Sequence, residues 1–158
     1  MNACVLCVGS LKEDWQKQGT NEYLKRLSRY GKYEIVEVPD EGEPDKPSEI
    51  LNAAVMDKEG KALLKHIKPT DFVVALCIEG KALSSTELAE ETRRWETAGK
   101  RVVLVIGGSL GLSKEVTARA DFKLSFSRMT FPHPLMRVIL MEQLYRAARI
   151  CAGERYHK

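Results

Sequence analysis

Three glycines follow a short apolar run in VLVIGGSLGL, residues 102–111, and such clusters often lie against a bound ligand. The segment is not a dinucleotide fingerprint, because GGSLG comes late in the chain and lacks the GxGxxG spacing. The nearest match to a phosphate-binding loop, ALCIEGKA at residues 75–82, has Ala75 in place of the first glycine and Ala82 in place of the hydroxyl residue. Tight turns alone would also explain the glycines.

A second segment, LSFSRMTFPHP at residues 124–134, alternates polar and apolar side chains before a proline-rich helix start. This pattern is typical of a loop that wraps a partly apolar ligand. Main-chain groups there can bind the edge of an adenine, while Leu76, Met129 and Phe131 cover its faces. The alternative is an irregular link between a strand and a helix that packs on the core.

The cysteines and histidines do not predict a metal site. Cys4 and Cys7 lie within the apolar run ACVLCV, and residues three apart on a strand point to opposite faces. We therefore expect buried, reduced thiols that act as small apolar side chains. His66, His133 and His157 have no metal-ligand spacing such as HExxH.

The composition is that of an ordinary globular protein. The 158 residues are 44% apolar and 30% charged, which predicts one domain spanning residues 1–158. We find no apolar run of membrane-spanning length and no signal-peptide pattern, so we expect a cytoplasmic protein. A net charge of +3 permits a nucleic-acid partner without requiring one.

Apolar strands and amphipathic helices alternate along the chain, which predicts an α/β fold with a mostly parallel sheet flanked by helices. Because ligands bind at the carboxyl ends of such strands, loops 76–80 and 106–111 should line one pocket. We expect strands at 3–9, 33–38, 71–78, 102–106 and 123–127, and helices at 14–30, 48–67, from Ser84 or Ser85 to 99, from about 113, and at 134–152.

The chain resembles a known family in the segments EYLKRLSRY, EIVEVPDE, IEGKALSS, VLVIGGSLGLS, LSFSRMTFPHPLMRVILMEQLYRA and GERYHK, which occur in this order between residues 5 and 158. It is similar to the small SPOUT-superfamily methyltransferases that methylate N3 of a pseudouridine in bacterial large-subunit ribosomal RNA. The resemblance implies a C-terminal trefoil knot, a homodimer, and S-adenosylmethionine bound by Leu76, Gly107, Gly108, Phe126, Ser127, Arg128, Met129, Thr130 and Phe131. Leu110 departs from the polar residue expected at that turn position.

The resemblance also implies a substrate role for the C-terminal tail. Methyl transfer from a sulfonium needs no metal, but N3 of pseudouridine must lose its proton, so a nearby cation or base would help. Arg155, Tyr156 and His157 offer such groups, whereas a frayed terminus is the alternative. The residues after Gly153 can extend ~16 Å, towards their own pocket or that of a partner.

Basic residues are expected to contact the RNA, in the assembled ribosome. Lys25, Arg26 and Arg29 cluster near the end of the first helix and form either a phosphate-binding patch or an ordinary solvated face. Arg128 and Arg137 lie closer to the predicted cofactor loop and are expected to contact the target nucleotide, and Lys158 in the tail is a further expected RNA contact.

The last helix is apolar around most of its circumference, which is too wide for one buried stripe, so we expect one of its faces to pack on a second subunit. The competing hypothesis for the function is a ribosome-binding protein that keeps this fold without catalysis.

Overall fold

The structure, a computed structural model, describes residues 1–158 and contains one five-stranded sheet in the order β2-β1-β4-β3-β5. Every pair of neighbouring strands is parallel, so the carboxyl ends of all five lie along one edge. The strands are β1 (Asn2–Val8), β2 (Lys32–Val38), β3 (Phe72–Ala82), β4 (Val102–Ile106) and β5 (Phe122–Ser125).

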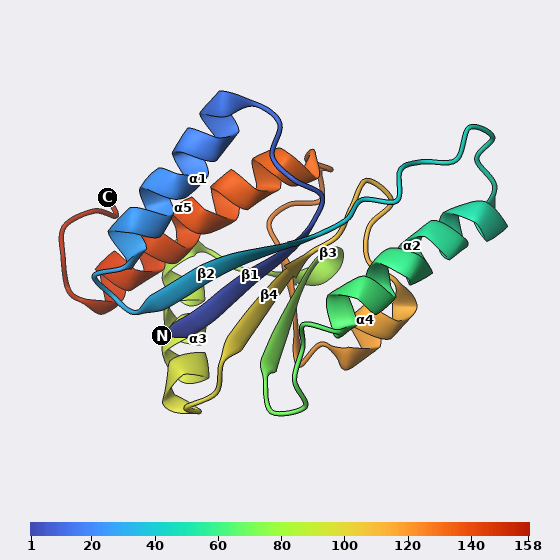
Figure 1. The fold of residues 1–158 in the computed structure, drawn as a ribbon. Helices are drawn as coiled ribbons and strands as arrows, with labels where there is room; N and C mark the ends of the chain where they lie inside the picture. The colour runs from blue at the N-terminus through green and yellow to red at the C-terminus, as the bar shows by residue number, and fades with distance from the viewer.

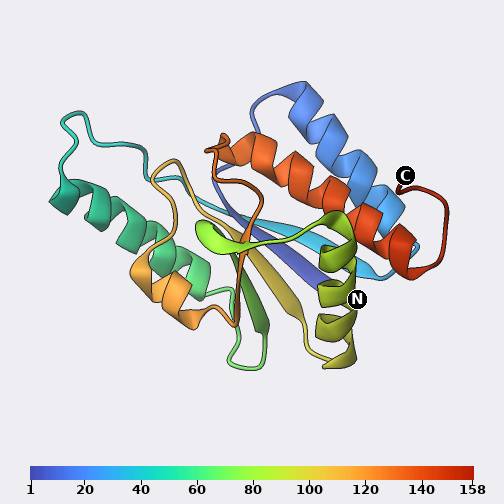
Figure 2. The same ribbon diagram turned by 180° about the vertical axis from the view of Figure 1, so that it is seen from behind.

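Helices cover both faces of the sheet, as expected for parallel strands joined by crossovers. One group of helices lies on one face and a second group on the opposite face (Figures 1 and 2). The first group is α1 (Asp14–Leu27), α3 (Ser85–Thr97) and α5 (His133–Cys151), and the second is α2 (Glu49–Leu64) and α4 (Lys114–Arg119). The α/β fold with a parallel sheet flanked by helices is thus confirmed.

Serines fix the starts of three helices. Ser48 and Ser113 accept hydrogen bonds from backbone N–H groups of Leu51 and Val116, at 3.2 and 3.3 Å. Ser84, rather than Ser85, caps α3, and the side chain of Glu87 accepts a hydrogen bond from the Ser84 backbone, which completes a capping box. These caps satisfy N–H groups that the first helical turn leaves without partners.

The side chains of β1 alternate between two cores. Cys4 packs in the core beneath α2 and α4, whereas Cys7 packs in the core beneath α1, α3 and α5. Burial raises the pKa of the Cys4 thiol to about 11 and that of Cys7 to about 12. The expectation that these cysteines are buried thiols on opposite faces is confirmed.

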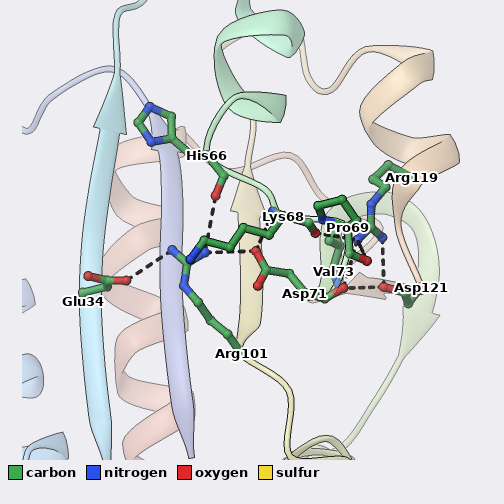
Figure 3. Close-up of polar contacts among 9 residues, drawn as sticks. All are labelled: Glu34, His66, Lys68, Pro69, Asp71, Val73, Arg101, Arg119 and Asp121. Atoms are coloured by element: carbon green, nitrogen blue, oxygen red, sulfur yellow. Dashed lines mark hydrogen bonds and ion pairs between the residues drawn. The ribbon is translucent and has the colours of Figure 1, made fainter.

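A polar network joins the strands at the amino edge of the sheet, opposite their carboxyl ends (Figure 3). Arg101 donates to the buried Asp71 carboxylate at 3.0 Å and to Glu34 on β2 at 3.2 Å. Arg119, at the end of α4, donates to Asp121 at 3.1 Å, and Asp121 accepts from the backbone N–H of Val73 on β3. These contacts hold the sheet together at the end away from the cavities described below.

Helix α5 lies between α1 and α3, with one side on the sheet, and none of its residues is exposed. The wide apolar surface that predicted a second subunit is therefore covered largely by helices of the same chain. A dimer needs support from other features of the molecule.

No helix combines the length and apolar character needed to cross a membrane.

Candidate active site

A cavity of about 870 Å³ opens at the carboxyl ends of β3, β4 and β5. Its walls come from the residues after Leu76, from the turn after Ile106 and from the segment between β5 and α5. Half of its 22 lining residues are apolar. This is the size and character of a small-molecule pocket, and it brings together the three segments that the sequence singled out.

The glycine turn forms one wall of the cavity and requires its glycines. A Cβ on Gly107 would lie 2.7 Å from the backbone carbon of Gly111, so any side chain there would force the turn open. The N–H of Gly111, whose φ is +89°, donates to the carbonyl of Gly108 at 3.1 Å. The tight-turn interpretation and the ligand-wall interpretation therefore both describe this segment.

The segment after β5 forms the facing wall. The hydroxyl of Ser127 accepts a hydrogen bond from the backbone N–H of Met129 at 3.0 Å, which folds the chain back at this point. Met129 has an exposed fraction of 72% and Phe131 of 36%, high values for apolar side chains at a cavity rim. Of the residues predicted to hold the cofactor, all but Arg128 line the cavity: Leu76, Gly107, Gly108, Phe126, Ser127, Met129, Thr130 and Phe131.

The lining carries negative rather than positive charge. Glu79 is its only carboxylate, and no lysine or arginine contributes to it. The imidazole of His133 lies at the junction with α5, and burial lowers its pKa, an effect that the Arg137 guanidinium reinforces and the Asp40 carboxylate opposes. At neutral pH this cavity therefore suits a ligand with positive charge better than one with a phosphate.

The predicted catalytic tail lies at the other end of α5 from the cavity (Figure 1). Tyr156 packs its ring against that of Tyr145, with 5.0 Å between ring centroids, and donates its O–H to Glu142 at 3.2 Å. Arg146 lies over the Tyr156 ring at 4.7 Å. These contacts fix Tyr156 on the surface of α5, whereas Arg155, His157 and Lys158 are exposed.

Burial, with the nearby Glu142 carboxylate, raises the pKa of Tyr156 to about 12. Its phenol is neutral at physiological pH and serves as a hydrogen-bond donor, not as a phenolate base.

The basic residues of α1 lie close to the tail. The side chains of Lys25 and Arg29 are exposed, whereas Arg26 pairs with Glu22 at 2.7 Å. Tyr30, next along the chain, donates its O–H to Glu154 at 2.7 Å, which joins the end of α1 to the start of the tail. One end of the molecule thus carries the α1 cluster together with the basic tail.

Arg137 does not occupy the exposed position that contact with RNA requires. Its side chain is 1% exposed, pairs with Glu37 on β2 and donates to the carbonyl of Gly9 at 2.8 Å. The predicted RNA contact is therefore wrong for this conformation, because Glu37, far away in sequence, draws the guanidinium into the interior. Arg128 remains exposed beside the cavity.

Sequence reasoning missed several residues of the site. Glu79 lies within the loop 76–80 that was predicted to line the pocket, but its carboxylate was not predicted to be a site residue. His133 was tested only for metal spacing, and its place within FPHP beside the predicted cofactor loop was a signal for it. Glu59, 3% exposed beneath Gly108, gave no signal, because a single glutamate in a helix is normally exposed.

The sequence matches the profile of the family described as "Predicted SPOUT methyltransferase" over residues 1–157. The chain belongs to this family. It is 56% identical to "Ribosomal RNA large subunit methyltransferase H" of Clostridium novyi (strain NT) and 51% identical to the protein of that name from Alkaliphilus oremlandii (strain OhILAs), over 100% of each chain. The "Putative ribosomal RNA large subunit methyltransferase H" of Methanococcus maripaludis (strain C5 / ATCC BAA-1333) is 49% identical, also over full length.

Among solved structures, the SPOUT fold of this chain is similar to that of a putative methylase family protein from Neisseria gonorrhoeae. The TM-score is 0.55 over 91% of this chain and 81% of that chain, at 14% identity, so this likeness concerns the fold alone.

The structure contains no group of three or more His, Cys, Asp or Glu side chains placed to hold a metal ion.

Proposed function

We propose that this SPOUT methyltransferase transfers a methyl group from S-adenosylmethionine to N3 of a pseudouridine in 23S large-subunit ribosomal RNA. The observation that carries the cofactor assignment is the charge of the large cavity, which has Glu79 in its lining and neither lysine nor arginine. S-adenosylmethionine is a cation at sulfur and carries no phosphate. The phosphates of a nucleotide cofactor would instead be repelled by the Glu79 carboxylate, and no lysine or arginine of the lining offsets that repulsion.

The residues of the cavity fit the parts of this cofactor. Leu76, Phe126 and Met129 offer apolar contact for the faces of an adenine, and the turn at Gly107 and Gly108 offers main-chain groups with no side chains in the way. When bound, the cofactor supplies an activated methyl group. The protein therefore has to align N3 with that methyl group and exclude water.

Two observations support ribosomal RNA as the substrate. Full-length relatives at about half identity are named as methyltransferases of the ribosomal RNA large subunit. The exposed Lys25 and Arg29, together with Arg128 and Lys158, supply cations that RNA phosphates require. We infer that the assembled ribosome in the cytoplasm is the substrate.

We infer that the enzyme is a homodimer in which the tail serves the partner's cavity. The 19 residues of α5 span about 28 Å, whereas the residues after Gly153 reach only ~16 Å when extended. Arg155, Tyr156 and His157 therefore cannot act in their own cavity while α5 is intact. The exposed apolar side chains at the cavity rim, Ile78, Met129 and Phe131, are suited to cover by a second chain.

In this assembly the tail supplies the substrate-facing groups. The Arg155 guanidinium can stabilise the anion formed when N3 loses its proton, the neutral Tyr156 phenol can donate a hydrogen bond, and His157 can accept the proton. The trefoil knot implied by the family resemblance remains a prediction about how the cavity segments are threaded.

The function is tested by incubating unmethylated ribosomes with the protein and S-adenosylmethionine carrying a labelled methyl group, followed by mass spectrometry of the rRNA nucleosides. We expect label in N3-methylpseudouridine and in no other nucleoside. A Gly107→Val variant, shown to be folded by circular dichroism, is the control and should give no product. If the well-folded wild-type protein binds ribosomes but not the cofactor, the non-catalytic alternative is correct.

A further inference from the structure

A second cavity, of about 530 Å³, lies at the carboxyl ends of β1 and β2. It shares His133 and Pro134 with the large cavity, so the two are neighbours along the same edge of the sheet. Only one of its 11 lining residues is apolar. The large, half-apolar cavity proposed for the methyl donor thus adjoins a smaller, polar cavity to which the cofactor proposal assigns no ligand.

The polar cavity is kept open at Gly9, which directly follows β1 and has φ +76°. Its N–H donates to the carbonyl of Val38 at 2.8 Å, and its own carbonyl accepts from Arg137. A Cβ on Gly9 would lie 3.4 Å from Nε2 of His133 and 3.6 Å from Cβ of Asp40. The imidazole and the carboxylate therefore converge on the space that Gly9 leaves free.

The polar groups of this cavity are available for a ligand. Lys12 and Asp40 are exposed and take part in no ion pair within the chain, and Gln16 adds an amide that both donates and accepts. One oxygen of Asp40 accepts from the N–H of Gly42 at 2.8 Å, which fixes the carboxylate, and the other oxygen, Oδ2, lies 3.7 Å from the position of a Cβ on Gly9, at the edge of the space that this glycine leaves free. Such mixed groups complement a uracil-type base, which has carbonyl oxygens and ring N–H groups.

We propose that the polar cavity binds the base of the target nucleotide and that Asp40 accepts a hydrogen bond from N1–H of pseudouridine. This proposal rests on the function proposed above. N1 and N3 lie on different edges of the pseudouridine ring. When N3 points past His133, which lines both cavities, towards the large cavity, N1 points into the polar cavity. In uridine N1 bears the sugar and has no hydrogen, so Asp40 is a specificity-determining residue.

The test compares Asp40→Asn with Asp45→Asn, the same change at an exposed position of the same loop outside the cavity. Asparagine keeps the oxygen that accepts from Gly42, so the loop should remain folded. We measure kcat/KM on ribosomes that contain pseudouridine and on ribosomes in which the target is uridine, and cofactor affinity by calorimetry.

We expect Asp40→Asn to lower kcat/KM on pseudouridine by about tenfold or more, because a hydrogen bond to a charged group is lost. Its preference for pseudouridine over uridine should fall, its cofactor affinity should stay within twofold, and Asp45→Asn should match the wild type. Lys12→Gln should raise KM without changing cofactor affinity.

An Asp40→Asn enzyme that keeps its rate, or that loses rate equally on both substrates, would overturn the proposal. Failure of the wild-type protein to bind the cofactor or to methylate either substrate would instead contradict the proposed function itself.

Discussion

The carboxylate of Glu59 lies directly against Gly108. A Cβ on Gly108 would stand 2.8 Å from Oε2 of Glu59, on the side of the turn that faces α2 rather than the cavity. The buried Glu59 also accepts a hydrogen bond from the N–H of Glu41 at 3.2 Å. One helix residue thus contacts both the glycine turn and the start of the loop before α2.

This contact predicts the effect of Gly108→Ala. The added methyl group meets Glu59 and pushes the turn towards the cavity, so the affinity for S-adenosylmethionine should fall about tenfold while the protein stays folded. The double variant Gly108→Ala/Glu59→Ala removes the Glu59 carboxylate that the added methyl group meets, so it should recover part of the affinity for S-adenosylmethionine. Calorimetry measures both variants, and equal affinities for Gly108→Ala and wild type would show that the turn does not touch the cofactor.

Glu59→Gln tests how the ionisation of the buried Glu59 carboxyl group affects stability. Burial raises the pKa of Glu59, and the Asp40 carboxylate adds to this effect, whereas the hydrogen bond from the Glu41 backbone opposes it. Glu59 therefore loses its proton at a lower pH in the unfolded chain than in the folded chain. Below the unfolded pKa the residue is protonated in both states and costs no stability. Above the raised pKa it is ionised in both states, and the buried charge destabilises the fold.

We therefore expect Glu59→Gln to gain free energy of unfolding relative to wild type as the pH rises from 4 to 7 in urea titrations. Asp57→Asn, an exposed change in the middle of the same helix, should show no such trend. A stability difference that is constant with pH would contradict the assignment.

Glu79→Gln separates charge from shape in the large cavity. S-adenosylmethionine carries one more positive charge than S-adenosylhomocysteine, so removal of the only lining carboxylate should weaken the first ligand more than the second. We expect a loss of about threefold to tenfold in the ratio of the two affinities, given that Glu79 is exposed to solvent. Equal losses for both ligands would mean that Glu79 does not face the sulfonium.

Deletion of Tyr156 to Lys158 tests the tail. Cofactor affinity should stay within a few-fold, because the cavity is unchanged, whereas methylation of ribosomes should be strongly reduced. Mixing this variant with Gly107→Val, which keeps its tail but lacks a working cavity, should restore activity through mixed dimers. Absence of restoration, with dimers shown by sedimentation, would mean that the tail does not act on the partner's cavity.

Asp71→Asn tests the network at the amino edge of the sheet. Asp71 is 4% exposed and pairs with Arg101, which is itself partly exposed, so its neutralisation should lower the free energy of unfolding by about 1–2 kcal/mol, the usual loss for a hydrogen bond to a charged group. Asp57→Asn on the exposed face of α2 is the matched control. Cofactor affinity should not change, because this network lies at the end of the strands away from the cavities.

The sequence predicted the elements well because local signals mark them. Ser48, Ser84 and Ser113 stand at helix starts, and the continuous apolar run at 102–106 indicates a strand covered on both faces. Helix boundaries were less accurate: the first helix ends at Leu27 rather than Tyr30, because the backbone N–H of Tyr30 bonds back to the carbonyl of Leu27 in a tight turn.

Tertiary contacts explain what the sequence could not predict. The strand expected to end at Ile78 continues to Ala82, because Gly80 packs against the backbone of Leu124 on β5, where a Cβ would come within 2.6 Å. Arg137 was expected on the surface, and only the fold brings Glu37 to it. The polar cavity likewise depends on Gly9 and His133, which are far apart in the chain.

With a tail that cannot reach its own cavity past α5, as proposed above, catalytic output depends on the amount of protein in the cell. If each cavity borrows its tail from another chain, a lone subunit is inert, and at low expression the concentration of working dimers falls with the square of the subunit concentration. A culture depleted of this protein would therefore lose modified ribosomes more steeply than it loses the polypeptide.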